Sequence, residues 1–223
     1  ISRSGTTSEI ISALRFLNGN PLITTMAVTC EANAEMAQIA DDSISLDHIN
    51  EKSVVMTQSF SCMYYALQLY AAKLADEEKI LNELKSIPFF AEQIFDQTGI
   101  VKTIADNLDF QRFVFLGSGL FNGIACEGTL KLKEMTQTEC ETYSKLEFRH
   151  GPISIVDHHT VVVLLTEEKT KELDQSLSKD IRAFGGYTVA IGNHGDLQTA
   201  NQTINLDTNL SDYVSSVLLF PFL

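Results

Sequence analysis

The chain has 223 residues, of which 44% are hydrophobic, and its 29 acidic and 16 basic residues give a net charge of −13 and an isoelectric point near 4.7. A chain of this length buries about 70% of its unfolded surface on folding, so it can build a full core in one or two domains. The negative charge repels a phosphodiester backbone, and we therefore expect no nucleic-acid partner.

The apolar stretches and the cysteines indicate an aqueous, reducing compartment. Residues 161–165 and 214–223 are among the longest apolar stretches and are too short to cross a bilayer, so we expect no membrane partner. The four cysteines lie far apart and form no C-x-x-C pair, which favours free thiols and a cytoplasmic protein. No dense metal-ligand spacing is present, so we expect neither a protein-bound metal nor another cofactor.

The first half of the chain alternates helices with strands. A loop rich in hydroxyl groups precedes a helix at residues 8–17. Further elements are a strand at 22–29, a helix at 33–40, a strand at 43–46, a long helical region from residue 51 to 75 and a second helical stretch at 77–107 that is broken at Pro88. The chain begins with Ile1 rather than Met, and we interpret it as a fragment of a longer protein.

The second half repeats this plan. The predicted elements are a strand at 113–116, a Gly/Ser turn, a helix at 120–135, a strand at 139–143, a loop that carries His150, a strand at 161–166, a helix at 169–184, strands at 187–192 and 203–206, and a terminal helix from Ser211. Strands that alternate with helices predict parallel pairing with right-handed crossovers.

The predicted fold class is therefore α/β, with two similar doubly wound units. Each unit has a parallel sheet between two helical layers, and the first unit is truncated at its N-terminus. The expected boundaries are residues 1–75 for the first unit, 76–111 for a helical connector and 112–223 for the second unit.

The loop before the first helix is a candidate phosphate site. Five hydroxyl side chains lie between Ser2 and Ser8, directly before the helix. The start of a helix carries unsatisfied N–H groups and a partial positive charge, which together bind anions. An ordinary Ser/Thr cap is the alternative, although a cap needs only one hydroxyl.

The helix at 120–135 carries a second candidate site. Glu127, Lys131 and Glu134 are spaced by four and then three residues, so they share one face beside the apolar stripe. A partly desolvated carboxylate that touches an ammonium group is suited to proton transfer. A solvent-edge ladder of ion pairs is the simpler alternative, but His150, presented from a Gly/Pro-bounded loop, favours a catalytic function.

Four motifs in order resemble the sugar isomerase (SIS) domain pair: SRSGTTSE at residues 2–9, EKSVVMT at 51–57, EGTLKLKE at 127–134 and EFRHGP at 147–152. That pair forms the isomerase half of glucosamine-6-phosphate synthase and also occurs in stand-alone amino-sugar-phosphate deaminases and isomerases. The resemblance implies three-layer α/β/α units and a homodimer whose site lies near the subunit interface. It also implies a sugar-phosphate site formed by Ser2, Arg3, Ser4, Gly5 and Thr7.

The resemblance implies roles for the remaining candidates. Glu134 would move a proton between C1 and C2 of the open-chain sugar, and His150 would assist ring opening, within its own subunit or in a partner's site. Lys131 and Glu127 would shape the sugar end of the pocket. The loop and the Phe-Arg-His order depart from the synthase pattern and resemble the stand-alone deaminase/isomerase branch.

The function expected from these residues is conversion of a hexosamine 6-phosphate, or a related phosphorylated hexose, to a ketose 6-phosphate. The isomerase domain of a glutamine-dependent fructose-6-phosphate aminotransferase is the nearest alternative, and a non-catalytic sugar-phosphate sensor is another. A dinucleotide-dependent oxidoreductase is disfavoured, because the turn at 117–119 lacks the third glycine of the dinucleotide motif.

Overall fold

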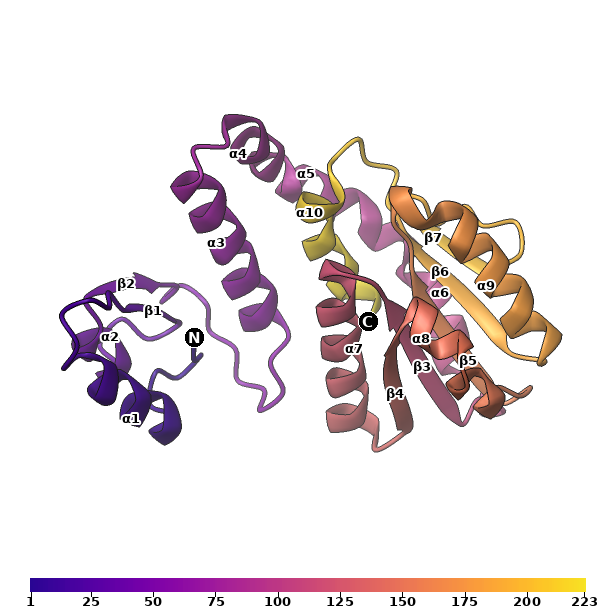
Figure 1. Cartoon of the computed structure of the whole chain (residues 1–223), viewed down its shortest axis with the longest axis horizontal. Helices are drawn as coiled ribbons and strands as arrows, with labels where there is room; N and C mark the ends of the chain where they lie inside the picture. The colour runs from indigo at the N-terminus through magenta and orange to yellow at the C-terminus, as the bar shows by residue number, and fades with distance from the viewer. The chain divides into compact units, whose positions relative to one another are not determined.

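The structure, a computed structural model, describes residues 1–223. The chain divides into two compact units, Ile1–Ala71 and Ala72–Leu223 (Figure 1). None of its helices combines the length and the apolar character that crossing a bilayer requires.

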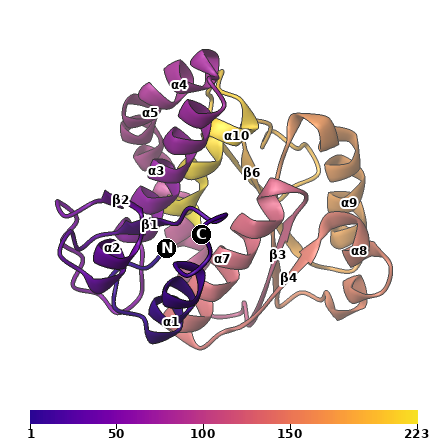
Figure 2. The same ribbon diagram turned by 60° about the vertical axis from the view of Figure 1, so that its left-hand side comes forward.

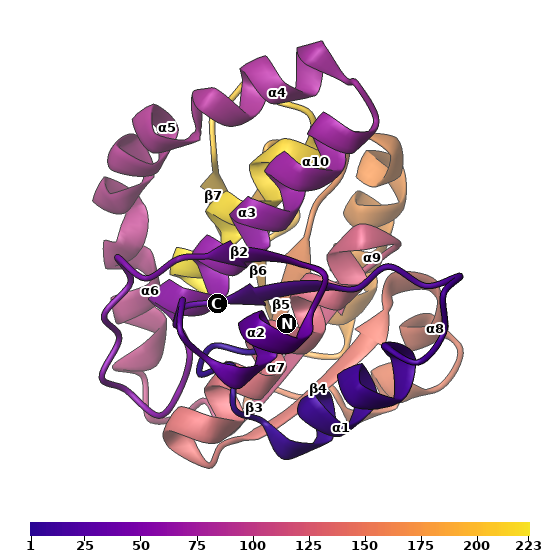
Figure 3. The same cartoon turned by 90° about the vertical axis from the view of Figure 1, so that its left-hand side faces the viewer.

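The first unit is a small α/β unit with two parallel strands. It contains α1 (Ser8–Leu17), β1 (Met26–Thr29), α2 (Glu35–Ile39), β2 (Asp42–Ser45) and most of α3 (Gln58–Leu74). Helices α1 and α2 lie on the same side of the strand pair (Figure 3). Ala27 of β1 packs there in one cluster with Ile11 of α1 and Met36 of α2. The next residue, Val28, faces the other way and packs with Met63 of α3, as the two-residue period of a strand requires.

The second unit begins with a helical segment and continues as a larger parallel α/β unit. Its helical segment contains α4 (Glu78–Lys85), α5 (Ile87–Ile94), the 3-10 helix η1 (Phe95–Gln97) and α6 (Thr98–Ala105). Its sheet strands are β3 (Arg112–Gly117), β4 (Glu139–Ser144), β5 (Thr160–Leu165), β6 (Tyr187–Gly192) and β7 (Gln202–Asn205). The helices around them are α7 (Leu120–Thr136), α8 (Lys145–Arg149), η2 (Pro152–Ile155), η3 (Glu168–Thr170), α9 (Lys171–Ala183), α10 (Asp212–Ser215) and η4 (Ser216–Phe222).

The five strands of this sheet are all parallel and lie in the order β4-β3-β5-β6-β7. The chain leaves β3 toward β4 on one side and returns to β5 on the other, so the strand order reverses between β3 and β5. Ligands of doubly wound sheets bind at the carboxyl ends of the strands beside such a reversal. In this unit that edge carries the turn at Gly117–Gly119 and the segment that follows Leu165.

Helices cover both faces of the sheet. Val114, Val162 and their even-numbered neighbours pack against α8 and α9, in a cluster that includes Phe148 and Leu177. The odd-numbered residues face α7, and a Cβ added at Gly128 would lie 3.1 Å from the ring of Phe115. Figure 2 shows α7 on one side of β3 and β4, with α8 and α9 on the other. Because both faces are covered, the middle strands are continuous apolar runs.

Most predicted elements are present, with four local differences. The first strand begins at Met26 rather than at residue 22, and residues 51–57 are not helical. The helical stretch at 77–107 breaks at Ser86 and again at η1, while Pro88 occupies the first turn of α5, where proline is tolerated. The loop predicted around His150 contains α8, whose N-cap Ser144 accepts a hydrogen bond from the Glu147 N–H.

The α/β class with parallel strands is confirmed. The first unit has only two paired strands, so its assignment as a second three-layer unit stays a prediction, as do the boundaries at residues 75 and 111.

Candidate active site

Backbone hydrogen bonds hold the start of the loop at residues 2–7 along one edge of β1, the edge that does not pair with β2. Ser2 N donates to Val28 O at 3.0 Å, and Cys30 N donates to Arg3 O at 3.0 Å. The chain then turns at Gly5, whose φ is +60° and where a Cβ would lie 2.4 Å from Cβ of Ala34. Only glycine fits this turn, because a side chain would meet both backbone strain and a clash.

The hydroxyl groups of this loop bond to one another rather than capping α1. Ser2 Oγ and Thr7 Oγ1 lie 2.8 Å apart, and Gly5 N donates to Ser2 Oγ at 3.2 Å. Ser4 Oγ accepts from Thr6 N at 3.3 Å. Thr7 is the N-cap residue of α1, but its side chain makes no capping bond. A simple cap by Thr7 therefore does not account for these hydroxyls.

A cavity of about 510 Å³ lies beside this loop within the first unit. Ser2, Arg3 and Thr7 line one part of it, and the rest is lined by Ile1, Met56 and residues of α3: Phe60, Met63, Tyr64 and Leu67. Ser4 and Gly5 are not among the lining residues. The cavity thus has hydroxyl groups and a guanidinium beside an apolar wall, the usual composition of a small-ligand site.

Glu51 organises the start of α3, which forms that wall. Its carboxylate accepts backbone hydrogen bonds from Thr57 N at 2.8 Å, Gln58 N at 3.0 Å and Ser59 N at 3.1 Å. Burial, the largest single effect, acts to raise the pKa of Glu51, but the hydrogen bonds from Ser59 and Thr57 together outweigh it and lower the pKa to about 2. Glu51 belongs to the motif at residues 51–57, but nothing in the sequence predicts that its carboxylate caps the start of α3.

In the second unit, α7 brings Glu127, Lys131 and Glu134 together as their spacing predicts. Lys131 Nζ lies 3.1 Å from Glu127 Oε1 and 3.0 Å from Glu134 Oε2. The side chains of Glu127 and Lys131 are 15% exposed, and that of Glu134 is 40% exposed. Partial burial acts to lower the pKa of Lys131, but the two carboxylates outweigh it and raise the pKa, so this ammonium stays charged.

The apolar stripe predicted beside these ion pairs, at Ile124, Gly128, Leu132 and Met135, is shorter than expected. Ile124 and Gly128 are buried, but Met135 is 64% exposed. Glu134, in the last turn of α7, therefore lies at an accessible end of the helix, where a ligand can reach its carboxylate.

His150 lies apart from the ladder. It is exposed and follows the last residue of α8, with its backbone N–H bonded to Glu147 O at 3.0 Å. Helix α8 packs on the face of the sheet that carries Val114, whereas α7 packs on the face that carries Phe115. Within one chain, the helices that carry Glu134 and lead to His150, α7 and α8, are therefore on opposite faces of the five-stranded sheet (Figure 2).

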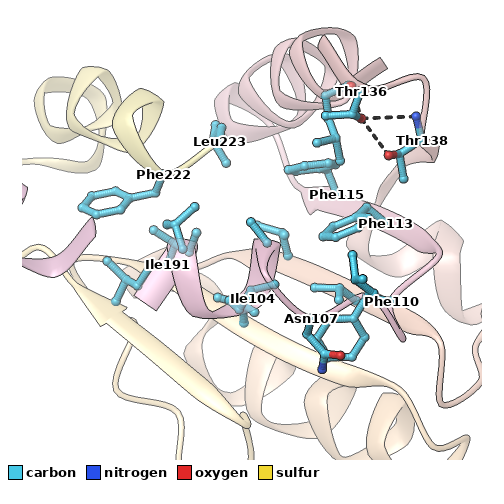
Figure 4. Close-up of a pocket in the computed structure, with 18 residues that line it drawn as sticks. Ile104, Asn107, Phe110, Phe113, Phe115, Thr136, Thr138, Ile191, Phe222 and Leu223 are labelled. Atoms are coloured by element: carbon cyan, nitrogen blue, oxygen red, sulfur yellow. Dashed lines mark hydrogen bonds between the residues drawn. The ribbon is translucent and has the colours of Figure 1, made fainter. Parts of the chain in front are cut away.

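A second cavity, of about 350 Å³, lies in the second unit between α6, α7 and the sheet (Figure 4). Its lining is apolar apart from Asn107, Thr136 and Thr138, and the two threonine hydroxyls bond to each other at 2.7 Å. None of the predicted site residues lines it. It has no charged group that could hold a phosphate, so it is a poor candidate for the substrate site.

The predicted site residues thus form two groups, and His150 belongs to neither. The hydroxyl loop is in the first unit and the ion-pair ladder is in the second. No group of three or more His, Cys, Asp or Glu side chains in residues 1–223 is arranged to hold a metal ion.

The model of the SIS domain matches residues 109–220 of this chain. The chain belongs to the SIS domain family. The matched part of this SIS protein contains the ladder on α7 and His150, whereas the hydroxyl loop at residues 2–7 lies outside it.

Curated relatives of this SIS protein include two glutamine–fructose-6-phosphate aminotransferases (isomerizing). The protein from Clostridium tetani is 30% identical over 206 residues, which cover 87% of this chain and 34% of the relative. The protein from Methanosarcina mazei is 29% identical over 232 residues, covering 99% of this chain and 36% of the relative. The chain spans about a third of the length of these relatives.

Solved structures with the same fold include the C-terminal domain of glucosamine-fructose-6-phosphate aminotransferase from Francisella tularensis. Its TM-score is 0.85 at 22% identity, over 99% of this chain and 67% of that chain. Glucosamine-6-phosphate deaminase from Thermotoga maritima gives a TM-score of 0.77 at 28% identity, over 99% of this chain and 66% of that chain. At 22% identity, the match to the Francisella tularensis structure bears on the fold alone.

Proposed function

We propose that this SIS protein interconverts phosphorylated sugars, and that its substrate is a hexosamine 6-phosphate, which it converts to a ketose 6-phosphate with release of ammonia. The observation that carries the proposal is the ladder on α7, where Lys131 Nζ lies 3.0 Å from the accessible carboxylate of Glu134. The resemblance of the four motifs to the deaminase/isomerase branch supports the same reaction. Four free cysteines agree with a cytoplasmic enzyme.

The phosphate group of the substrate binds the loop at residues 2–7 in this proposal. The hydroxyls of Ser2, Ser4 and Thr7 and the backbone N–H groups of Arg3 and Gly5 supply the donors. The contact between Gly5 N and Ser2 Oγ is long, at 3.2 Å, so a phosphate oxygen can replace it at little cost. Binding the remote phosphate orients the reacting carbons, which converts binding energy into rate.

Glu134 acts as the base in the chemical step. It removes the proton from C2 of the open-chain amino sugar, and the C–H electrons form a C1–C2 double bond as the aldehyde oxygen takes a proton from water and becomes an enol hydroxyl. Return of the proton from Glu134 to C1 gives the iminium ion of the ketose at C2. Water hydrolyses this ion to the ketose and ammonia, and one proton returns to solvent. Lys131 stabilises negative charge that develops next to it, and Glu127 holds Lys131 in place.

His150 assists ring opening from a second copy of the chain. The support for this assignment is the sheet between α7 and α8, which separates Glu134 from His150 of the same chain. A homodimer with the site near its interface can bring the two groups together, and we propose that arrangement.

A second candidate is the isomerase part of a glutamine-dependent fructose-6-phosphate aminotransferase, the name borne by the curated relatives described above. The same groups would then catalyse the exchange on a sugar that receives ammonia rather than losing it. A non-catalytic sensor needs the phosphate loop but has no use for both Glu134 and His150.

The deciding experiment measures turnover of a panel of hexose and hexosamine 6-phosphates, with ammonia release followed in parallel. Turnover with ammonia release from a hexosamine 6-phosphate supports the deaminase, and ammonia incorporation only in the presence of glutamine supports the aminotransferase. Glu134→Gln should lower kcat by at least about 100-fold and leave sugar-phosphate binding nearly intact.

Glu172→Gln is the matched control, because Glu172 is an exposed residue on α9 outside the proposed site. Near-normal turnover by Glu134→Gln would remove Glu134 from the mechanism.

A further inference from the structure

Helix α8, which carries the chain from β4 to His150, has only five residues. A helix this short has no stability of its own in water, so its position depends on what its side chains contact. Three of them point inward. Lys145 and Phe148 are fully buried, and Arg149 is half-buried.

Lys145 ties the first residue of α8 to α9. Its Nζ lies 3.0 Å from each carboxylate oxygen of Asp174, 2.9 Å from Thr170 Oγ1 and 3.4 Å from Glu167 Oε1. The side chains of Lys145 and Asp174 are both 0% exposed. Every donor of this ammonium has an acceptor and no part of it reaches solvent, so Lys145 cannot itself attack a substrate.

Arg149 ties the last residue of α8 to the same helix. Its Nη2 donates to Asp180 Oδ2 at 2.5 Å and to Ser176 Oγ at 3.4 Å. Between the two anchors, the ring of Phe148 packs 5.4 Å from that of Tyr143 on β4. Both ends of α8 are thus fixed to α9, and its middle is fixed to the sheet.

The outward face of α8 is exposed, so its side chains can reach a substrate. Leu146, Glu147 and His150 are exposed, and no side chain in residues 1–223 holds the His150 ring with a hydrogen bond. The direction of the imidazole therefore depends on the backbone that precedes it. Buried ion pairs such as Lys145–Asp174 add little net stability but can fix one arrangement among several.

We propose that the Lys145–Asp174 and Arg149–Asp180 pairs form a clamp that positions His150, with Lys145 and Arg149 as positioning residues rather than catalytic ones. The proposal rests on the function proposed above, since it assigns the clamp to the imidazole of that site. Loss of the clamp lets α8 move and lowers the fraction of molecules in which the imidazole is correctly placed.

The test replaces the buried pair by an uncharged one, Lys145→Met with Asp174→Asn, in the full-length protein. Amide hydrogen exchange of the segment at 145–151 should become faster by about 10-fold, with the five-stranded sheet still protected. With a sugar-phosphate substrate, kcat should fall by about 10-fold while KM stays within about 2-fold. The matched control is Lys171→Met with Asp196→Asn, which removes an exposed pair that also involves α9 but does not touch α8.

Unchanged exchange at 145–151 in a folded double variant overturns the clamp, as does a kcat loss equal to that of the control. If the double variant does not fold, Asp180→Asn gives the same test at the half-exposed anchor, where exchange at 149–151 should rise and an unchanged rate overturns the proposal. A failure of the proposed function can be distinguished from a failure of the clamp. If the proposed function is wrong, the wild-type protein will convert no phosphosugar. The exchange measurement needs no substrate, so it will still test the clamp.

Discussion

The guanidinium of Arg3 donates a hydrogen bond to the carbonyl oxygen of Ser53, 2.7 Å away, and lies 3.8 Å from the carboxylate of Glu51. Arg3 belongs to the hydroxyl loop, and Ser53 and Glu51 belong to the segment that leads into α3. This contact joins the proposed phosphate site to the wall of the cavity beside it.

Arg3→Met should weaken binding of inorganic phosphate or of a hexose 6-phosphate by about 10-fold, because the loop loses its tie to residue 53 and a positive charge near the anion. Isothermal titration calorimetry measures the affinity directly. Arg15→Met is the control, because Arg15 forms an exposed pair with Glu35 outside the loop. Equal affinity in both variants would contradict the phosphate assignment.

Glu51 should make the stability of the first unit depend on pH. Its pKa is about 2 in the folded chain and 4.5 in the unfolded chain, so its contribution is complete above about pH 5 and disappears as pH falls toward 2. A difference of about 2.5 units corresponds to about 3 kcal/mol. Glu51→Gln should therefore cost about 2 to 3 kcal/mol at pH 7 and much less near pH 2.

Urea unfolding of both proteins between pH 2 and 7 tests this prediction. Burial raises the pKa of Asp174 and Glu167, so those groups favour folding at low pH, but they are present in both proteins and cancel in the difference. A difference that does not change with pH would show that the Glu51 carboxylate is not the titrating group.

Gly117→Ala should destabilise the second unit by at least about 2 kcal/mol. A Cβ there would lie 2.1 Å from the carbonyl oxygen of Phe121, which is backbone of the first turn of α7 and cannot rotate away. Gly123→Ala in the same helix meets nothing within 4 Å and should instead stabilise by roughly 0.5 to 1 kcal/mol. Thermal unfolding of the two variants should shift in opposite directions, and a shift in the same direction would contradict the geometry at Gly117.

Mixing Glu134→Gln with His150→Gln tests whether two chains share one site. Random pairing of two inactive variants should restore about a quarter of the wild-type turnover, because half the dimers are mixed and each mixed dimer has one intact site. Mixing either variant with the Glu134→Gln/His150→Gln double variant should restore none. No recovery in the first mixture would place both groups of a site in one chain.

Local features of the site could be predicted from the sequence. Glu127, Lys131 and Glu134 meet because a helix brings residues three and four apart together, and the helix at 8–17 is confirmed because its apolar spacing is regular. Helix α8 was missed because five residues are too few to show a period.

Contacts between distant segments could not be predicted. Nothing in the sequence around Lys145 indicates that a lysine there is fully buried against Asp174, because that depends on how α8 packs on α9. The separation of Glu134 from His150 likewise requires the strand order, which decides the face that each helix covers.

The all-parallel sheet has a kinetic consequence. None of its strand pairs is a hairpin: β3 pairs with β4 only after α7 has been traversed, and with β5 only after β4 and α8 as well. Each pairing must first close a long loop, so the second unit should fold more slowly than a helical bundle of its size and expose apolar strands while it does so. Slower synthesis at low temperature should therefore raise the yield of folded protein.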